Sequence, residues 1–192
     1  MVRQSERSEA TIRAVLDAAR RLFAAQGFAA TSIDGIAAKA GVAKGAVYHH
    51  FASKEAIFGH VFEAASAELA QAIPAEARKG KDPLDRITRG TLKYLTGISE
   101  PPYRRILLID GPVVLGWGRW READQRHFGH LLQAPHAVGT LDARETQALG
   151  HLLAGAMTEA ALVCATAQNP ARTARELTAA FRALISGLLR GA

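Results

Sequence analysis

Residues 31–51 read TSIDGIAAKAGVAKGAVYHHF, and this stretch decides the fold of the first part of the chain. It predicts two very short helices joined by a tight turn. Helices under about 12 residues are marginally stable in water, so both need a further helix to pack against. The apolar side chains available for that packing are Ile33, Ile36, Val42, Val47 and Phe51.

The turn between the two short helices has the spacing of a helix-turn-helix. Ala37 is small where the helices cross closely, and Gly41 follows where the turn requires a positive φ. Thr31 is predicted to cap the first short helix, with Asp34 at the acidic position of a capping box. The second short helix covers about residues 44–50, and in a helix-turn-helix it is the one that enters the major groove of DNA.

Longer helices are expected on both sides of this motif. The preceding one spans about residues 8–26, and Gly27 is predicted to end it in a left-handed conformation. Ser53 is expected to cap a following helix that runs to about residue 78. The apolar side chains of the first helix recur with helical spacing at Ile12, Leu16, Ala19 and Phe23.

The rest of the chain also reads as helix, because no segment alternates apolar and polar residues for long enough to form a strand. Asp82-Pro83 and Asn169-Pro170 mark two helix starts. The fold class is therefore all-α, with about nine helices. The further helices are expected at about residues 82–98, 101–110, 116–132, 142–168 and 170–189, with a loop at 133–140.

Composition restricts the class of protein. The 192 residues include 24 Lys and Arg against 18 Asp and Glu, a formal charge of +6 that weakly indicates a polyanionic partner. One Cys cannot form an internal disulfide, and no Cys/His cluster has zinc-site spacing. The charged N-terminus is unlike a secretion signal, and no apolar run approaches a membrane span. We expect a cytoplasmic protein without membrane contact, cofactor or metal.

The N-terminal third resembles the TetR/AcrR type of transcriptional regulator, with a match over about residues 8–60. A weaker likeness to one subset of that family's C-terminal domains covers residues 103–117. The resemblance implies a helix-turn-helix domain at 8–60, with the motif at 32–51, and a ligand-binding and dimerisation domain at 61–192. The residues that carry it are Gln26-Gly27-Phe28, Thr31-Ser32-Ile33, Ile36-Ala37, Ala40-Gly41-Val42, Gly45, Tyr48-His49-His50-Phe51 and Ser53-Lys54-Glu55.

The resemblance further implies a repressor that binds a palindromic double-stranded DNA operator as a homodimer. A small-molecule effector in the C-terminal domain would change the spacing of the two recognition helices. Lys44 is the best candidate for reading a base, because Lys can donate to guanine O6 and N7. The DNA-binding residues implied in this way are Thr31, Ser32, Lys44, Gly45, Ala46, Tyr48, His49 and Lys54, of which Thr31, Ser32 and Lys54 would hold the phosphate backbone.

The recognition helix departs from the family pattern. Ala43 stands where many relatives have a capping Ser or Thr, and Ala46 offers only a methyl group. Specificity then depends on thymine methyl contacts or on DNA shape. Tyr48 is assigned to phosphate in preference to the core, Phe51 to the core, and one of the two neighbouring histidines to the solvated surface.

The C-terminal region carries no catalytic motif, so an enzyme is not expected. Four aromatic residues are candidates for the walls of an apolar ligand cavity, with an ordinary core as the alternative: Tyr94, Trp117, Trp120 and Phe128. Asp124, His127 and His130 share a helix face and are open to two readings, a metal site or hydrogen-bonded neighbours.

The last two helices carry apolar stripes beside small residues. This pattern fits a four-helix bundle formed by two subunits, although the same helices can instead close the core of one subunit. The candidate interface residues are Leu152, Ala156, Ala160, Phe181, Leu184 and Leu188.

Three functions are compatible with the sequence. The first is a ligand-responsive DNA-binding repressor, which the motif and the resemblance favour. The second is a small helical enzyme or ligand carrier that uses the tryptophans and the Asp124 face. The third is an architectural protein that binds DNA without regard to sequence.

Overall fold

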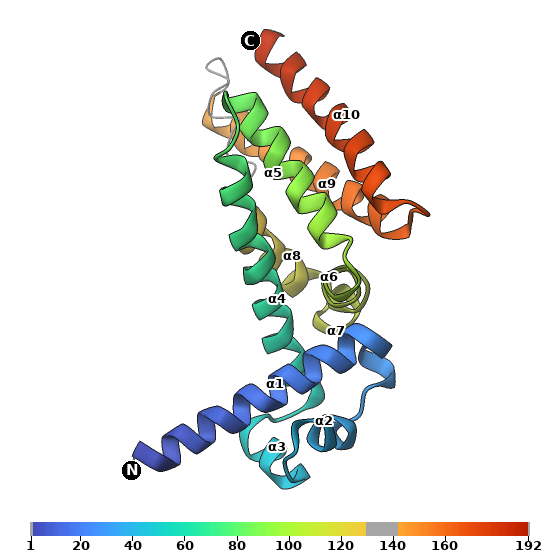
Figure 1. The fold of residues 1–192 in the computed structure, drawn as a ribbon. Coiled ribbons are helices and arrows are strands. Elements are labelled where there is room, and N and C mark those ends of the chain that lie inside the picture. The colour runs from blue at the N-terminus through green and yellow to red at the C-terminus, as the bar shows by residue number, and fades with distance from the viewer. Residues whose placement is uncertain (1, 130–141, 192) are drawn as a thin grey trace. The chain divides into compact units, whose positions relative to one another are not determined.

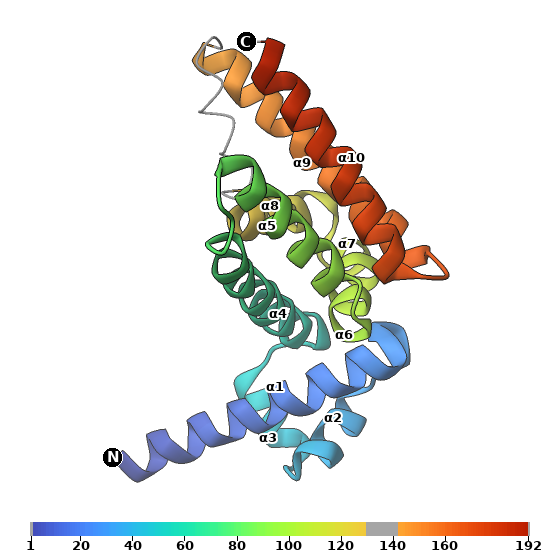
Figure 2. The ribbon, with the colours of Figure 1, turned by 45° about the horizontal axis from the view of Figure 1, so that its top comes forward.

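The structure is a computed structural model that describes residues 2–129 and 142–191. The described residues form helices and no strand, which confirms the all-α fold class (Figures 1 and 2). The expected loop at 133–140 and His130 lie outside the described residues. The elements are α1 (Val2–Ala30), α2 (Ile33–Ala40), α3 (Lys44–His50), α4 (Lys54–Ala77), α5 (Pro83–Ile98), α6 (Pro101–Tyr103), the π-helix η1 (Arg104–Asp110), α7 (Gly111–Leu115), α8 (Trp117–Phe128), α9 (Ala143–Thr166) and α10 (Pro170–Gly191).

The chain divides into two compact units that are not continuous in sequence. Residues 1–65 and 101–120 form the first unit, and residues 66–100 and 121–192 form the second. A segment from the middle of the chain thus belongs to the same unit as the helix-turn-helix, whereas the sequence suggested one boundary near residue 60. The two functional domains inferred from the resemblance, 8–60 and 61–192, remain a prediction.

Gly27 interrupts α1 where the sequence predicts a stop. Its φ of 81° is positive as expected, but its ψ of 172° differs from the left-handed helical conformation that was predicted. Helix resumes after this kink and runs to Ala30. This combination of φ and ψ is accessible essentially to Gly alone. A Cβ on Gly27 would also lie 2.0 Å from the guanidinium of Arg105.

Gly27→Ala is therefore expected to lower the free energy of unfolding by about 1–3 kcal/mol or more, because a side chain is strained in this conformation. Gly116 has a nearly equal backbone, with φ 77° and ψ 152°, and nothing lies within 4 Å of its Cβ position. Gly116→Ala thus measures the backbone strain alone. Chemical denaturation should show the larger loss for Gly27→Ala, since Arg105 must also move. Equal losses would mean that the Arg105 contact is unimportant.

The turn between α2 and α3 follows the predicted geometry, whereas the predicted cap does not. Gly41 is left-handed, with φ 69° and ψ 30°. Ser32 caps α2 by accepting from the backbone N–H of Gly35 at 3.0 Å. Thr31 as the cap was wrong, and so was the capping box with Asp34. The Thr31 hydroxyl is buried and donates to the Gly27 carbonyl at 2.8 Å.

An aromatic cluster forms much of the core of the first unit. The ring of Phe58 on α4 lies 5.2 Å from that of Phe23 and 5.3 Å from that of Phe28, in edge-on contact with both. Edge-to-face pairs of this kind stabilise a core beyond the area they bury. The predicted packing of both short helices on α1 is confirmed by their contacts with it, and Val47 and Phe51 are buried.

The segment 101–120 is joined to the kink of α1 through one carboxylate. Asp110 ends η1, and its Oδ2 accepts from the backbone N–H of Phe28 at 2.8 Å and from Arg105 Nε at 3.3 Å. Gly111 follows without a side chain, because a Cβ there would lie 2.8 Å from the Phe62 ring. These contacts explain why the segment belongs to the first unit although the sequence placed it in a C-terminal domain.

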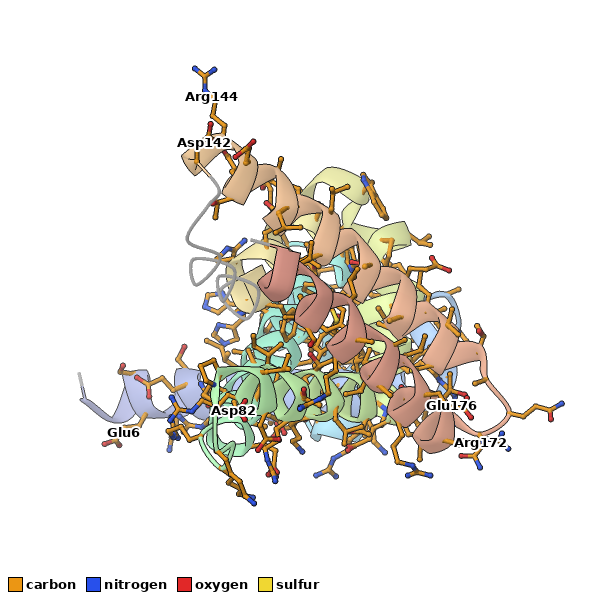
Figure 3. The ribbon with its side chains drawn as sticks, turned by 90° about the horizontal axis from the view of Figure 1, so that it is seen from above. Glu6, Asp82, Asp142, Arg144, Arg172 and Glu176 are labelled. Carbon is orange, nitrogen blue, oxygen red and sulfur yellow. The ribbon has the colours of Figure 1, made fainter. Side chains whose placement is uncertain are left out.

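The second unit contains α5, α9 and α10, with α9 and α10 side by side (Figures 1 and 2). As predicted, Asp82 caps α5 with Pro83 at its first turn, and the Asp82 carboxylate accepts from the Asp85 N–H. A full capping box at Asp142 and Glu145 starts α9. Figure 3 shows Arg172 beside Glu176 near the start of α10, and their side chains pair at 2.8 Å.

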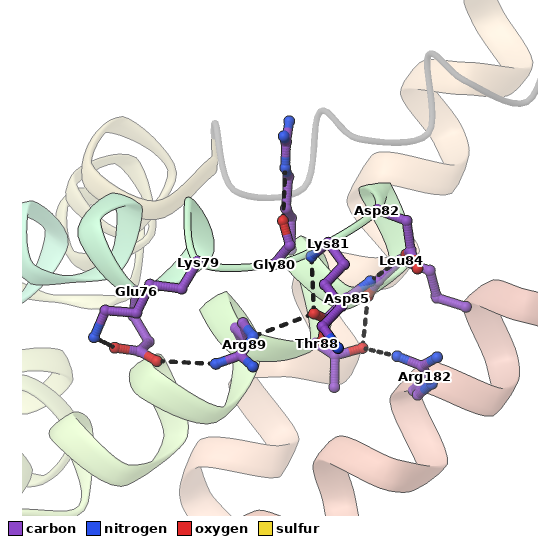
Figure 4. Close-up of polar contacts among 11 residues, drawn as sticks. Glu76, Lys79, Gly80, Lys81, Asp82, Leu84, Asp85, Thr88, Arg89 and Arg182 are labelled. Carbon is purple, nitrogen blue, oxygen red and sulfur yellow. Dashed lines mark hydrogen bonds and ion pairs between the residues drawn. The ribbon is translucent and has the colours of Figure 1, made fainter.

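A polar network surrounds the start of α5 (Figure 4). The Lys81 backbone N–H, and then Arg89, lower the pKa of Asp85. Arg89 also reaches Glu76 at 3.4 Å. The Thr88 hydroxyl of α5 accepts a hydrogen bond from Arg182 of α10 at 3.1 Å, which links α5 to α10.

Candidate nucleic-acid interface and ligand cavity

The exposed face of α3 carries the residues expected to meet DNA. Val47 is fully buried and anchors the helix, while Tyr48 is 50% exposed. Lys44, Gly45 and His49 are exposed, and Ala46 is half-buried. Lys44 and Tyr48 are four residues apart and share a face, as do Gly45 and His49. The structure thus brings these predicted residues together on one short helix.

Lys44 is held by an acidic neighbour from α2. Its Nζ lies 2.9 Å from an Asp34 carboxylate oxygen, with both side chains more than half exposed. This hydrogen bond raises the pKa of Lys44, so the side chain stays cationic at neutral pH. Solvent screens an exposed pair, so exchange of Asp34 for a DNA group costs little. α3 has no side-chain cap at Ala43, as the sequence indicated.

Two residues assigned to DNA serve the fold instead. Thr31 is 1% exposed, which removes its hydroxyl from any surface contact. Lys54 Nζ donates to the Phe28 and Thr31 carbonyls at 2.8 Å each, and it lies 4.1 Å from the centre of the Phe28 ring. We correct the assignment of Lys54 from a phosphate contact to an anchor that joins the start of α4 to the end of α1. Ser32 stays exposed, with its hydroxyl engaged as the α2 cap.

The second unit contains a cavity of about 170 Å³. An engineered cavity of roughly 150 Å³ is large enough to bind benzene, so this one suits a ligand of about that size. The rings of Tyr94 and Phe128, with centres 5.1 Å apart, line it as predicted. Further apolar walls come from Ile73, Ile87 and Met157.

The two tryptophans do not line this cavity, so that part of the prediction was wrong. Trp120 is buried in the first unit, where its indole N–H donates to the Leu107 carbonyl at 2.7 Å. Trp117 is 63% exposed, with its ring centre 4.9 Å from that of Trp120.

Polar groups at the cavity come from α5, α8 and α9. Asp124 lines the wall with its side chain 15% exposed, and it pairs with Arg121 at 3.8 Å. Burial raises the pKa of Asp124, although Arg121 opposes the rise. Arg121 also donates to the Thr158 hydroxyl at 3.2 Å. Burial raises the pKa of Tyr94, so its phenol remains protonated.

Asp124 was considered in the sequence only as a partner of two histidines. The described residues contain no group of three or more side chains placed to hold a metal, and His130 lies outside them. The cavity role of Asp124 had one signal in the sequence, its position four residues before Phe128, which places both on one face of α8.

The predicted dimer residues divide between surface and core. Leu152 is 72% exposed and Leu184 is 50% exposed, while Ala156 is exposed and Ala160 and Leu188 are half-buried. Phe181 is 9% exposed, so its assignment to the interface is corrected to the core of its own unit.

One described helix is long and apolar enough to cross a membrane, contrary to the expectation from sequence. Residues 144–166 of α9 include a window of mean hydropathy 1.5, of which 22% is buried. Length and composition alone are weak grounds for a membrane span, because helices of soluble proteins meet the same criteria.

Two protein-family models match the chain. The model for bacterial regulatory proteins of the tetR family matches residues 15–61, and the model for a tetracyclin repressor-like C-terminal domain matches residues 84–188. The chain belongs to the TetR family. The resemblance seen in the sequence is confirmed, and the HTH-type regulator AcrR of Shigella flexneri is 31% identical over 104 residues, 54% of this chain and 48% of that protein.

Other TetR-family proteins extend the match. The Transposon Tn10 TetC protein of Escherichia coli is 40% identical over 60 residues, 31% of this chain and 30% of that protein. The matched segments thus span about half or less of the length of these two curated relatives. A crystal structure of a TetR-family regulator from Pectobacterium atrosepticum is 29% identical, with a TM-score of 0.76, and the match covers 95% of this chain and 96% of that one.

Proposed function

We propose that this TetR-family chain is a cytoplasmic transcriptional repressor and not an enzyme. It binds a palindromic operator as a homodimer, and a small-molecule effector releases it. The observation that carries the proposal is the exposed face of α3, where Lys44, Tyr48 and His49 project from a helix fixed by the buried Val47.

The geometry of α3 supports a role in the major groove. Lys44 begins the helix, the end that contacts base edges in helix-turn-helix proteins. Tyr48, one turn later, can donate to a phosphate while Gly45 and Ala46 allow close approach. Ala46 offers a methyl group, which suits contact with a thymine methyl.

The exposed apolar residues of α9 and α10 support a homodimer. Leu152, Ala156 and Leu184 are exposed although each is apolar, and an exposed apolar patch of this kind favours an interface. A second copy of the chain would cover both stripes in a four-helix bundle. One seven-residue helix makes too few base contacts for specific binding. Two copies of α3 would double that number.

A gel shift with DNA from upstream of the chain's own gene tests the proposal. We expect a discrete shifted band that survives excess non-specific competitor and whose protein stoichiometry is two chains per site. Smearing that competitor removes would instead support a sequence-neutral architectural protein. A strictly monomeric protein that binds no duplex, including duplexes selected from random DNA, would refute the repressor.

A further inference from the structure

The cavity of the second unit has a largely buried carboxylate at its wall, and this group restricts what the cavity can bind. The Asp124 carboxylate is 85% removed from solvent, since its side chain is 15% exposed. Among the described residues, Arg121 is its recorded ion-pair partner, at the long distance of 3.8 Å. A desolvated carboxylate gains most from a hydrogen-bond donor brought by the ligand.

The charges around the cavity disfavour an ionised ligand. Asp124 and Arg86 both line the cavity, and Arg121 pairs with the Asp124 carboxylate. A cation at Asp124 would meet a carboxylate that already pairs with Arg121, and an anion would face Asp124. Either ion would have to be desolvated without a single dominant counter-charge, which is costly in an apolar site. A neutral ligand avoids both costs.

The shape and the apolar walls fit a ring. The ring planes of Tyr94 and Phe128 are inclined at 59° to each other, and Met157, with its flexible thioether, also lines the cavity. Aromatic ligands pack well in such angled arrangements. The phenol of Tyr94 lies in the same cavity and is protonated, so it can donate to an oxygen of the ligand.

We propose that the cavity binds a neutral, ring-sized apolar molecule that carries one hydroxyl group, and that Asp124 accepts the hydrogen bond from this hydroxyl. Asp124 is then a specificity-determining residue: it selects hydroxylated ligands over hydrocarbons of the same shape. This inference rests on the proposed function: it places the small-molecule effector of that repressor in this cavity and names the effector's chemical class.

Four probes of similar size separate the alternatives in the free, full-length protein without DNA. p-Cresol and p-xylene differ only by hydroxyl against methyl, while benzylamine and benzoate supply a cation and an anion at pH 7. Ligand-detected NMR or calorimetry gives the dissociation constants. We expect p-cresol to bind at least 10-fold more tightly than p-xylene, as a hydrogen bond to a charged group implies, and more tightly than either ion.

Variants assign the preference to one side chain. Asp124→Leu is expected to abolish the preference for p-cresol over p-xylene, whereas Asp124→Asn, which keeps a neutral acceptor, retains part of it. Glu122→Leu removes an exposed carboxylate from the same helix and should change nothing. Circular dichroism checks that each variant is folded. If Asp124→Leu is unfolded, the reduced preference of Asp124→Asn for p-cresol over p-xylene serves as the test.

Several results would overturn the proposal. If benzylamine binds most tightly, Asp124 is the counter-ion of a cationic ligand. If benzoate binds most tightly, the arginines near the cavity, and not Asp124, determine which ligand binds. Equal dissociation constants for p-cresol and p-xylene would refute the hydroxyl contact. So would the absence of any probe with a dissociation constant below about 10 mM. If p-cresol is selected as expected but operator DNA is not bound, the proposed repressor fails while the assignment of the cavity stands.

Discussion

Replacing Lys44 with alanine is expected to lower the affinity for the operator about 100-fold. A base contact of this kind discriminates roughly 10-fold or more, and a homodimer loses it in both half-sites. Because Lys44 is assigned to a base, the variant should also relax the preference at one position in each half-site. Binding to an operator library, measured by fluorescence anisotropy at fixed salt, gives both quantities.

Two controls isolate the base contact from the loss of one positive charge. Lys39→Ala removes an exposed Lys of α2 and should weaken binding to all sequences alike, with a small effect. Lys44→Ala also leaves Asp34 unpaired near the DNA, so Asp34→Asn with Lys44→Ala removes that added repulsion. A uniform loss of affinity in this double variant, with the preference intact, would make Lys44 a phosphate contact.

Replacing Lys54 with methionine is expected to lower the free energy of unfolding by about 3 kcal/mol, because two carbonyls lose a charged donor and Phe28 loses its cation. Methionine retains the apolar stem of lysine, so the change tests the ammonium group. Urea denaturation measures the loss, with the exposed Lys39→Met as the control that should stay within about 0.5 kcal/mol.

The same variant tests DNA binding separately. Under conditions where Lys54→Met remains folded, the slope of log affinity against log salt should be unchanged, because the ammonium is bound to the protein's own backbone. A flatter slope with unaltered stability would restore Lys54 as the phosphate contact that its place in the motif first indicated.

Much of the fold follows from interactions between residues within about five positions of each other. Gly41 supplies the left-handed turn, and Asp82 caps the helix that begins beside it. Such features depend on backbone groups that are always nearby, so the residue types alone predict them. The choice between Thr31 and Ser32 as a cap was missed because the Thr31 hydroxyl is bonded to the Gly27 carbonyl in a buried position.

The candidate sites could be predicted only in part. The exposure of Lys44, Tyr48 and His49 is consistent with the helical period once Val47 points inward, whereas their role at DNA was implied by the resemblance and stays a prediction. The cavity was half found: Tyr94 and Phe128 are in it, but Trp120 packs elsewhere on a hydrogen bond to Leu107. An aromatic side chain can line a cavity or fill a core equally well, because both sites are apolar. The sequence pattern therefore does not distinguish a cavity wall from a core.

By itself, the sequence determined that this chain is helical, that it begins with a helix-turn-helix, and that it belongs with the TetR regulators. Only the folded structure shows that Lys44 lies exposed beside Asp34, that Lys54 is bonded to backbone carbonyls, and that Asp124 lines a cavity. Lys44 and Lys54 have the same side chain, and they differ because Lys54 meets carbonyls 23 and 26 residues away. The burial and the partners of a charged group depend on such distant contacts, and these exist only once the chain has folded.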